Sequence, residues 1–133
     1  MSPASDAPGG ILADEDGSAV VEFVLVGLLL TALTLGVLQL GLAAYVRNVV
    51  HDAAFAGAHH AGLADTTLAE GVDRARELIR RAVGEAYATD VAAAERPDAT
   101  VEVVVRAPLP IVGLWGVGGT MEVRAHAPAE SLD

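Results

Sequence analysis

The chain has 133 residues, of which 53% are hydrophobic, a formal net charge of −10 and no cysteine. This length allows one modest domain, and the lack of cysteine excludes a disulfide framework and thiolate metal sites. Eight basic residues stand against eighteen acids, so the clustered cations of a nucleic-acid-binding surface are missing. We therefore expect no nucleic-acid partner.

Residues 1–17 mix Pro, Ser, Gly and acidic residues and end in Asp14, Glu15, Asp16 and Gly17. They show no periodicity that could support a packed element. We expect a disordered leader here.

Residues 23–46 form an uncharged stretch of twenty-four residues. As a helix it would be about 36 Å long, enough to cross the hydrocarbon core of a bilayer with some tilt. Phe23 and Tyr45 stand near its two ends, where interfacial aromatic residues are expected. The sequence predicts a single transmembrane helix.

Beyond Arg47, small apolar residues recur at helical spacing, which predicts that the membrane helix continues as a stalk. They are Val50, Ala53, Ala54, Gly57, Ala58 and Ala61. Thr67 and Glu70 then have the spacing of a capping box, and a second apolar stripe follows. Its members are Leu68, Val72, Ala75, Ile79, Ala82, Val83 and Ala86. These features predict a second, amphipathic helix of about twenty residues.

Two later segments change to a period of two. Residues 99–106 and 120–127 each alternate apolar and polar side chains, which predicts two strands of an antiparallel hairpin with room for one extra strand. The linker 108–119 is apolar and contains Trp115. It either folds back onto its own hairpin or contacts another subunit or the membrane. The predicted fold class is α+β.

The string from Gly17 to Phe23 stands directly before the apolar span. Glu22 is a carboxylate at the edge of this span, a costly position unless the charge is paired or hydrated. It lies four residues after Ser18, one helical turn along the same face. Cleavage after Gly17 would give Ser18 a new amino group that could pair with Glu22 of a neighbouring subunit. The alternative interpretation is that Glu22 only reaches out to the membrane surface.

These residues resemble a known signal. A glycine, a small residue and a glutamate four positions further on, opening a hydrophobic helix, are typical of the class III signal of type IV pilin-like proteins. Residues 40–48 and 53–58 are similar to the segment that follows the membrane helix in TadE-like proteins. The resemblance to the TadE-like family covers residues 17 to about 127. Two features depart from the pattern: the residues before Gly17 are acidic instead of basic, and Phe23 stands where pilin members often have Tyr.

The resemblance implies a minor pilin or pseudopilin of the tight-adherence (Flp pilus) system with a pilin-like fold. Gly17 and Ser18 would flank the bond cut by a prepilin peptidase, and Glu22 would be the assembly carboxylate. The implied partners are the lipid bilayer, the prepilin peptidase, other pilin-like subunits and tight-adherence assembly proteins.

The same resemblance implies a division of the chain. Residues 1–17 would be a cytoplasmic leader that is cleaved, residues 18–64 the transmembrane helix and stalk, and residues 65–133 a small extracytoplasmic α+β domain. We expect a single-pass protein of the cell membrane with a cytoplasmic N-terminus.

Three residues of the span bear on helix association. Ala32 and Gly36 lie four apart, so they offer a small-residue face on which a second helix could approach closely. This spacing also arises by chance in a span rich in Gly and Ala. The amide of Gln39 favours a hydrogen-bonding partner within hydrocarbon, which another helix would supply.

Other functional classes fit the sequence less well. A cleaved secretory signal peptide needs a positive start and a shorter apolar core, and both conditions fail. A signal-anchored extracytoplasmic binding module remains the alternative. The histidines His51, His59 and His60 lack the ligand spacing of a metal site. We expect no enzyme, no cofactor and no metal.

Overall fold

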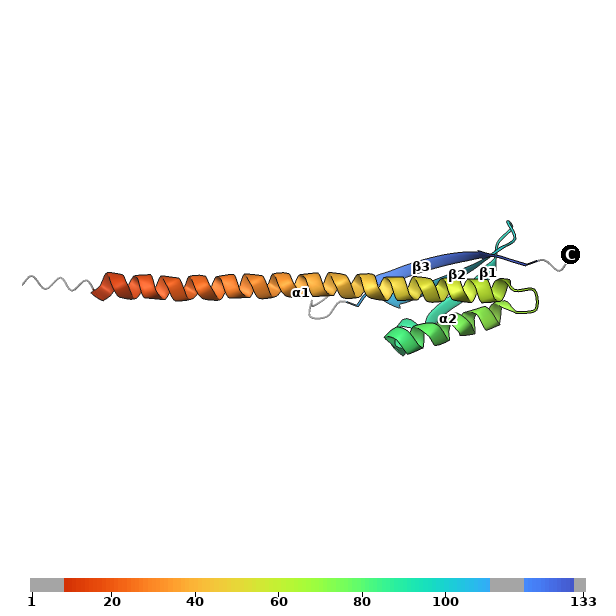
Figure 1. Cartoon of the computed structure of the whole chain (residues 1–133), viewed down its shortest axis with the longest axis horizontal. Coiled ribbons are helices and arrows are strands. Elements are labelled where there is room, and N and C mark those ends of the chain that lie inside the picture. The colour runs from red at the N-terminus through yellow and green to blue at the C-terminus, as the bar shows by residue number, and fades with distance from the viewer. Residues whose placement is uncertain (1–8, 111–118, 131–133) are drawn as a thin grey trace, which may run out of the picture. The chain divides into compact units, whose positions relative to one another are not determined.

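The computed structural model describes the backbone of residues 9–110 and 119–130, with side chains from Asp14 onward. The described elements follow the order α1, α2, η1, β1, β2, β3 (Figure 1). Their bounds are α1 Gly9–Gly62, α2 Leu68–Val83, the 3-10 helix η1 Glu85–Tyr87, β1 Asp90–Glu95, β2 Thr100–Pro108 and β3 Thr120–Pro128. A long apolar N-terminal helix, a second helix and a small antiparallel sheet confirm the predicted α+β class.

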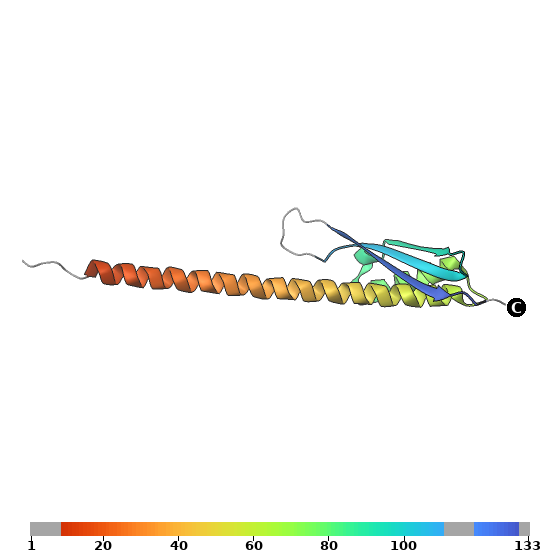
Figure 2. The ribbon, with the colours of Figure 1, turned by 90° about the horizontal axis from the view of Figure 1, so that it is seen from above.

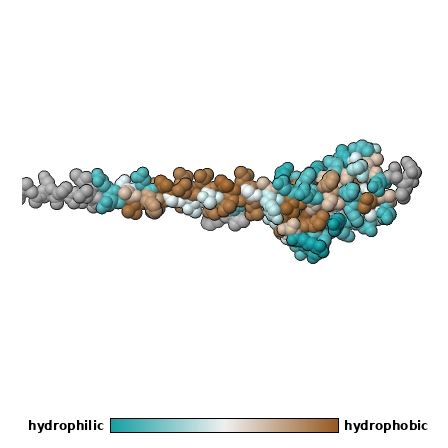
Figure 3. Space-filling model, in the orientation of Figure 1, coloured by the Kyte–Doolittle hydropathy of each residue, from teal (hydrophilic) through white to brown (hydrophobic). Residues whose placement is uncertain are grey.

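The chain divides into two compact units, Met1–Leu38 and Gln39–Asp133, and α1 contributes to both. In the first unit the apolar side chains of α1 are exposed: Phe23 is 79% exposed and Leu29 69%. Figure 3 shows hydrophobic residues covering this part of the helix. Thr31 and Thr34 donate their hydroxyl hydrogens to the carbonyls of Gly27 and Leu30, at 2.8 Å each, so these hydroxyls need no water.

The segment Asp14–Gly62 holds an 18-residue window of mean hydropathy 2.4, and none of that window is buried within the chain. α1 is therefore long and apolar enough to cross a membrane. Of the described residues, no other helix meets this test.

The expectation of a disordered leader is wrong for residues 9–17, which are helical. These residues are helical because helix formation is cooperative: each residue added to an existing helix fixes few dihedral angles and gains one hydrogen bond. The strongly helical segment that follows therefore extends backwards through Asp14, Glu15 and Asp16. Residues 1–8 lie outside the described part of the chain.

The second unit contains a three-stranded antiparallel sheet in the order β1-β2-β3. In β2 the buried apolar side chains are Val101, Val103, Val105 and Ala107, and in β3 they are Met121, Val123, Ala125 and Ala127. The predicted alternation is thus confirmed in both strands. One detail was wrong: Ala99, expected as the first inward residue of β2, has a φ of 59° and lies in the turn before the strand.

The helices and the sheet form two layers. The outer turns of α1 and the helix α2 cover one face of the sheet, as Figures 1 and 2 show together. The buried side of α1 is the stripe predicted from the sequence, with Val50, Ala54 and Ala58 all fully buried. Ile79 of α2 is fully buried in the same core. Burying a side chain of this kind contributes about 1.5–3 kcal/mol.

The ends of α2 follow the predicted local chemistry. Thr67 and Glu70 form a capping box, in which the Thr67 amide donates to Glu70 Oε2 at 2.6 Å and the Glu70 amide donates to Thr67 Oγ1 at 3.2 Å. The helix has 16 residues, fewer than expected, because Gly84 takes a φ of 107° and ends it.

The base of the β2–β3 hairpin is closed by a hydrogen bond from the Leu109 amide to the Gly119 carbonyl, at 2.9 Å. The predicted contacts of the apolar linker, including those of Trp115, lie outside the described residues.

Candidate functional site

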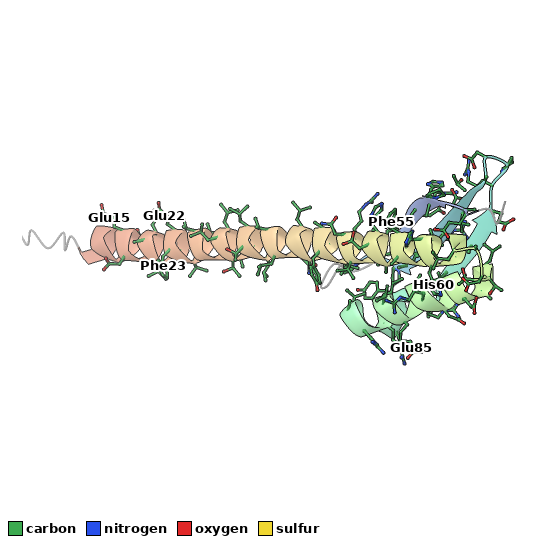
Figure 4. All side chains as sticks on the ribbon, turned by 45° about the vertical axis from the view of Figure 1, so that its right-hand side comes forward. Glu15, Glu22, Phe23, Phe55, His60 and Glu85 are labelled. Carbon is green, nitrogen blue, oxygen red and sulfur yellow. The ribbon has the colours of Figure 1, made fainter. Side chains whose placement is uncertain are left out.

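The N-terminal motif lies on continuous helix within the first unit. Gly17, Ser18 and Glu22 are all exposed and helical. Ser18 and Glu22 are four residues apart, which places them on one face with an axial separation of about 6 Å. Glu22 and Phe23 leave α1 on different sides (Figure 4). The Glu22 carboxylate is therefore presented outward, separate from the aromatic ring beside it.

Gly17 has no packing role among the residues that the structure describes. A Cβ built on Gly17 would meet no heavy atom within 4 Å, and its backbone is helical. An alanine at this position would therefore fit the helix without strain. Packing against the described residues does not require glycine at this position.

Ala32, Gly36 and Gln39 share one side of α1 by their spacing. Ala32 and Gly36 are exposed, Gln39 is half-buried, and a Cβ built on Gly36 would meet no atom within 4 Å. The space for a second helix is present at Gly36. Close packing of another helix on these residues stays a prediction.

The outward face of the sheet carries a cluster of charges centred on Glu102, which is only 9% exposed. Arg96 Nη1 donates to Glu102 Oε2 at 2.9 Å, and Arg124 Nη1 donates to Glu102 Oε1 at 3.3 Å. The Nε2 atom of His126 lies 2.6 Å from Glu102 Oε2. Burial alone would raise the pKa of Glu102, but the His126 hydrogen bond and the two guanidinium charges outweigh it and hold this pKa below its ordinary value.

Glu122 extends the cluster along β3. It accepts hydrogen bonds from Arg106 Nε at 2.9 Å and from Arg124 Nε at 2.6 Å. These two bonds lower the pKa of Glu122. The hydrogen bond between Arg106 and Glu122 also raises the pKa of Arg106. The cluster is a connected set of ion pairs between β2 and β3, joined by Arg96 from the turn that follows β1.

Two grooves flank α2. One is lined by charged residues of α2 and η1 together with Ala88 and Thr89, and Arg76 closes part of it by donating from Nε to the Ala88 carbonyl at 3.1 Å. The other is a largely apolar groove of about 230 Å³ between α1 and α2, lined by Val49, Asp52, Ala53, Leu78 and Ala82. Within the described residues, no group of three His, Cys, Asp or Glu side chains could hold a metal ion.

The exposed N-terminal motif and the apolar helix after it can be compared with known proteins. The model of the family described as TadE-like protein matches residues 17–59. This segment of the chain is TadE-like. The resemblance predicted from the sequence is confirmed over these residues. No curated protein and no solved structure matches the chain.

The TadE-like segment begins at Gly17, the residue predicted to precede the cleaved bond, and ends within the second unit. It therefore includes Ser18, Glu22, Ala32, Gly36 and Gln39. Ser18 and Glu22 lie on one face of α1, and the roles expected for all five residues stay predictions.

Sequence reasoning missed the Glu102 cluster and the groove beside Leu78. Glu102 and His126 lie 24 residues apart and meet because the register pairs them across β2 and β3. The alternation of the two strands placed both on the polar face, so a correct register would have found the pair.

Proposed function

We propose that this protein is a structural, pilin-like subunit that acts in assembly of a tight-adherence (Flp, type IV-like) pilus, as a minor pilin or pseudopilin. The observation that carries the proposal is a coincidence of two boundaries. The TadE-like match begins at Gly17, and Gly17 is also where the cleavage motif precedes an apolar helix able to cross a membrane. The uncharged apolar stretch begins six residues later, at Phe23.

The mechanism we propose is subunit association, without a chemical reaction by this protein. A prepilin peptidase cuts after Gly17 and leaves a protonated amine on Ser18. In a low-dielectric environment, this amine and the Glu22 carboxylate of a neighbouring subunit attract each other much more strongly than they would in water. Because Glu22 is exposed on α1, it is accessible to such a neighbour.

The proposed topology follows from this processing. The peptidase acts on the cytoplasmic side, so the leader of residues 1–17 is cytoplasmic and the α+β domain of residues 65–133 is extracytoplasmic. The partners are the bilayer, the peptidase, other pilin-like subunits and tight-adherence assembly proteins. In this arrangement the sheet, the Glu102 cluster and α2 form the part of the subunit exposed outside the membrane.

The test is the N-terminal sequence and intact mass of the full chain extracted from membranes, with and without a co-expressed prepilin peptidase. We expect a new N-terminus at Ser18 only when the peptidase is present. Gly17→Ala is the matched control, because alanine fits the helix at this position. It should abolish the cut while leaving the protein folded and in the membrane. An uncut wild-type chain in the presence of active peptidase would favour a signal-anchored extracytoplasmic binding module instead.

A further inference from the structure

The core of the second unit begins where the uncharged stretch of α1 ends. Val46, the last residue of this stretch, is only 2% exposed, and Val50 and Ala54 follow it into the same core. As a helix, the stretch of residues 23–46 is about 36 Å long, about 6 Å more than the hydrocarbon core of a bilayer. This excess matches the depth of the polar headgroup layer on one side. The unit therefore starts at the level of the headgroups, without a free length of helix before it.

The end of β2 and the start of β3 lie at the same level. The other end of β3 is fixed beside the end of α1, because the Glu130 amide donates to the Gly62 carbonyl at 2.7 Å. From Pro128 back to Thr120, the strand covers about 26 Å. β3 runs alongside α1 in both views (Figures 1 and 2), and this length of helix holds about 17 residues. Thr120 is therefore level with about Tyr45.

α2 also ends close to this level. Gly71, near its start, packs against Gly57 of α1. Ala82, near its end, lines a groove together with Val49, so α2 runs antiparallel to α1. Three parts of the unit thus share one end, next to the last turns of the uncharged stretch: α1, the last turn of α2, and the β2–β3 pair.

The exposed side chains at this end suit the boundary between water and lipid. Tyr45 is 56% exposed and Leu109, directly after β2, is 36% exposed. Arg47 is exposed and makes no ion pair with a described residue, whereas Arg81 pairs with Glu77 at 2.6 Å. Aromatic rings and the long stems of arginines are favoured at headgroup depth, where one end is apolar and the other hydrated. We call Tyr45, Arg47, Arg81 and Leu109 the span-side surface.

The charges around this surface nearly balance. Arg47 and Arg81 stand near two exposed acids that follow the end of α2, Glu85 and Asp90. A net positive charge is therefore not the reason for contact with lipid. The apolar and aromatic side chains supply the attraction, and the guanidinium groups can bind the phosphate that zwitterionic and anionic phospholipids both carry.

We propose that the span-side surface rests on the bilayer leaflet from which α1 emerges. Leu109 and Tyr45 lie among the headgroups and the upper acyl chains, and Arg47 and Arg81 contact lipid phosphates. The partner is the lipid around α1, because the surface is continuous with the apolar stretch that crosses the membrane. This contact rests on the membrane placement in the proposed function and is independent of cleavage. It fixes the unit against the membrane at a defined height.

A depth measurement tests the contact with the span-side surface left intact. The full chain has no cysteine, so Thr120→Cys and Glu130→Cys each give one site for a fluorescent label. Both positions are exposed, and they lie near opposite ends of β3. The labelled proteins are reconstituted in phosphatidylcholine vesicles, with and without lipid that carries a nitroxide quencher in its headgroup or upper acyl chain.

We expect the nitroxide lipids to quench the label at Thr120 severalfold more than the label at Glu130. Equally weak quenching at both positions would overturn the proposal, because the unit would then stand away from the bilayer. Equally strong quenching would also overturn it, because the unit would then lie along the membrane instead of resting on one end.

Two substitutions test the side chains, with the label kept at Thr120. Leu109→Asp and Arg47→Glu should each reduce the quenching towards the value at Glu130. Arg47→Glu guards against a folding defect, since Arg47 is exposed and has no ion-pair partner among the described residues. Unchanged quenching in both variants would overturn the assignment of this surface.

Phe55→Asp is the matched control for Leu109→Asp. Phe55 is also an exposed apolar residue, at 51%, and it is labelled in Figure 4. It lies nine residues after Val46, about 14 Å further along the helix, and should not reach the lipid. We expect Phe55→Asp to leave the quenching at Thr120 unchanged, and a loss as large as that of Leu109→Asp would contradict the specific contact.

N-terminal sequencing separates this proposal from the proposed function, because the vesicle measurement needs no peptidase. A Ser18 N-terminus in cells, together with weak quenching at Thr120, would overturn the lipid contact and leave the proposed function standing. Strong quenching at Thr120 in a chain that the peptidase never cuts would support the lipid contact and contradict the proposed processing.

Discussion

Gly57 of α1 and Gly71 of α2 lie so close together that a methyl group on either would come within 2.7 Å of the other's carbonyl oxygen. No real Cβ tolerates such a distance to backbone, which cannot move aside as a flexible side chain can. Ala61 and Ala75 continue the same narrow contact, and both are buried. The two helices approach closely because small residues face each other along their line of contact.

Alanine at either glycine should therefore destabilise the second unit. For Gly57→Ala or Gly71→Ala we expect a loss of about 1–3 kcal/mol in the free energy of unfolding, the usual cost of overpacking a dense core. Thermal unfolding of the full chain in detergent, followed by circular dichroism, measures this loss. Gly41→Ala is the control, because its Cβ would meet no atom within 4 Å. Equal melting temperatures for all three variants would contradict the close contact.

The charge cluster on the sheet predicts sensitivity to acid. The pKa values of Glu102 and Glu122 lie below the ordinary range in the folded protein. The folded state therefore binds these protons less tightly than the unfolded state does. Their contribution to stability is complete above the unfolded pKa and is lost as the pH falls through the folded pKa. We expect the melting temperature to drop as the pH falls below about 4.3, the ordinary pKa of a glutamate carboxyl, because the unfolded state then takes up protons that the folded state binds less tightly.

Glu102→Gln isolates this effect. The variant should melt at a lower temperature than the wild type at pH 7, and the difference should shrink towards pH 3. Glu95→Gln serves as control, since Glu95 is exposed on β1 and makes no ion pair within the described residues. The same pH profile for Glu102→Gln and wild type would show that the cluster contributes nothing to folding stability.

The structural features that the sequence predicts correctly depend on residues that lie close together in the chain. The capping box of Thr67 and Glu70 involves residues three apart, and the alternation of Val101, Val103 and Val105 defines a face without knowledge of any partner. The apolar span and the TadE-like motif are likewise contiguous in sequence. These features were found because every residue that they need is near in the chain.

The features that were missed depend on distant partners or on side chains too small to show a pattern. In β1, Ala92 is exposed and Ala93 is half-buried, so the inward and outward positions carry the same residue and no alternation was visible. Glu102 meets His126 only through the register of β2 and β3, which pairs residues 24 positions apart. The groove beside Leu78 needs the packing of α1 on α2, which no local pattern specifies.

Substitutions at Glu22 can separate cleavage of the leader from assembly of the subunits. In the proposed mechanism the peptidase recognises Gly17 and Ser18. Glu22 acts later, when its carboxylate pairs with the Ser18 amino group of a neighbouring subunit. Glu22→Ala should therefore still give a Ser18 N-terminus but lose most of the assembled material recovered by shearing cells. Glu22→Asp keeps the charge on a shorter side chain, and we expect it to restore part of this assembly.

The control for position is Glu15→Ala, which removes a nearby exposed carboxylate that lies before the cut and leaves with the leader. It should leave the sheared fraction unchanged once cleavage has occurred. Wild-type recovery from Glu22→Ala would mean that the carboxylate only reaches the membrane surface and takes no part in subunit pairing. Loss of both cleavage and assembly would instead assign Glu22 to recognition by the peptidase.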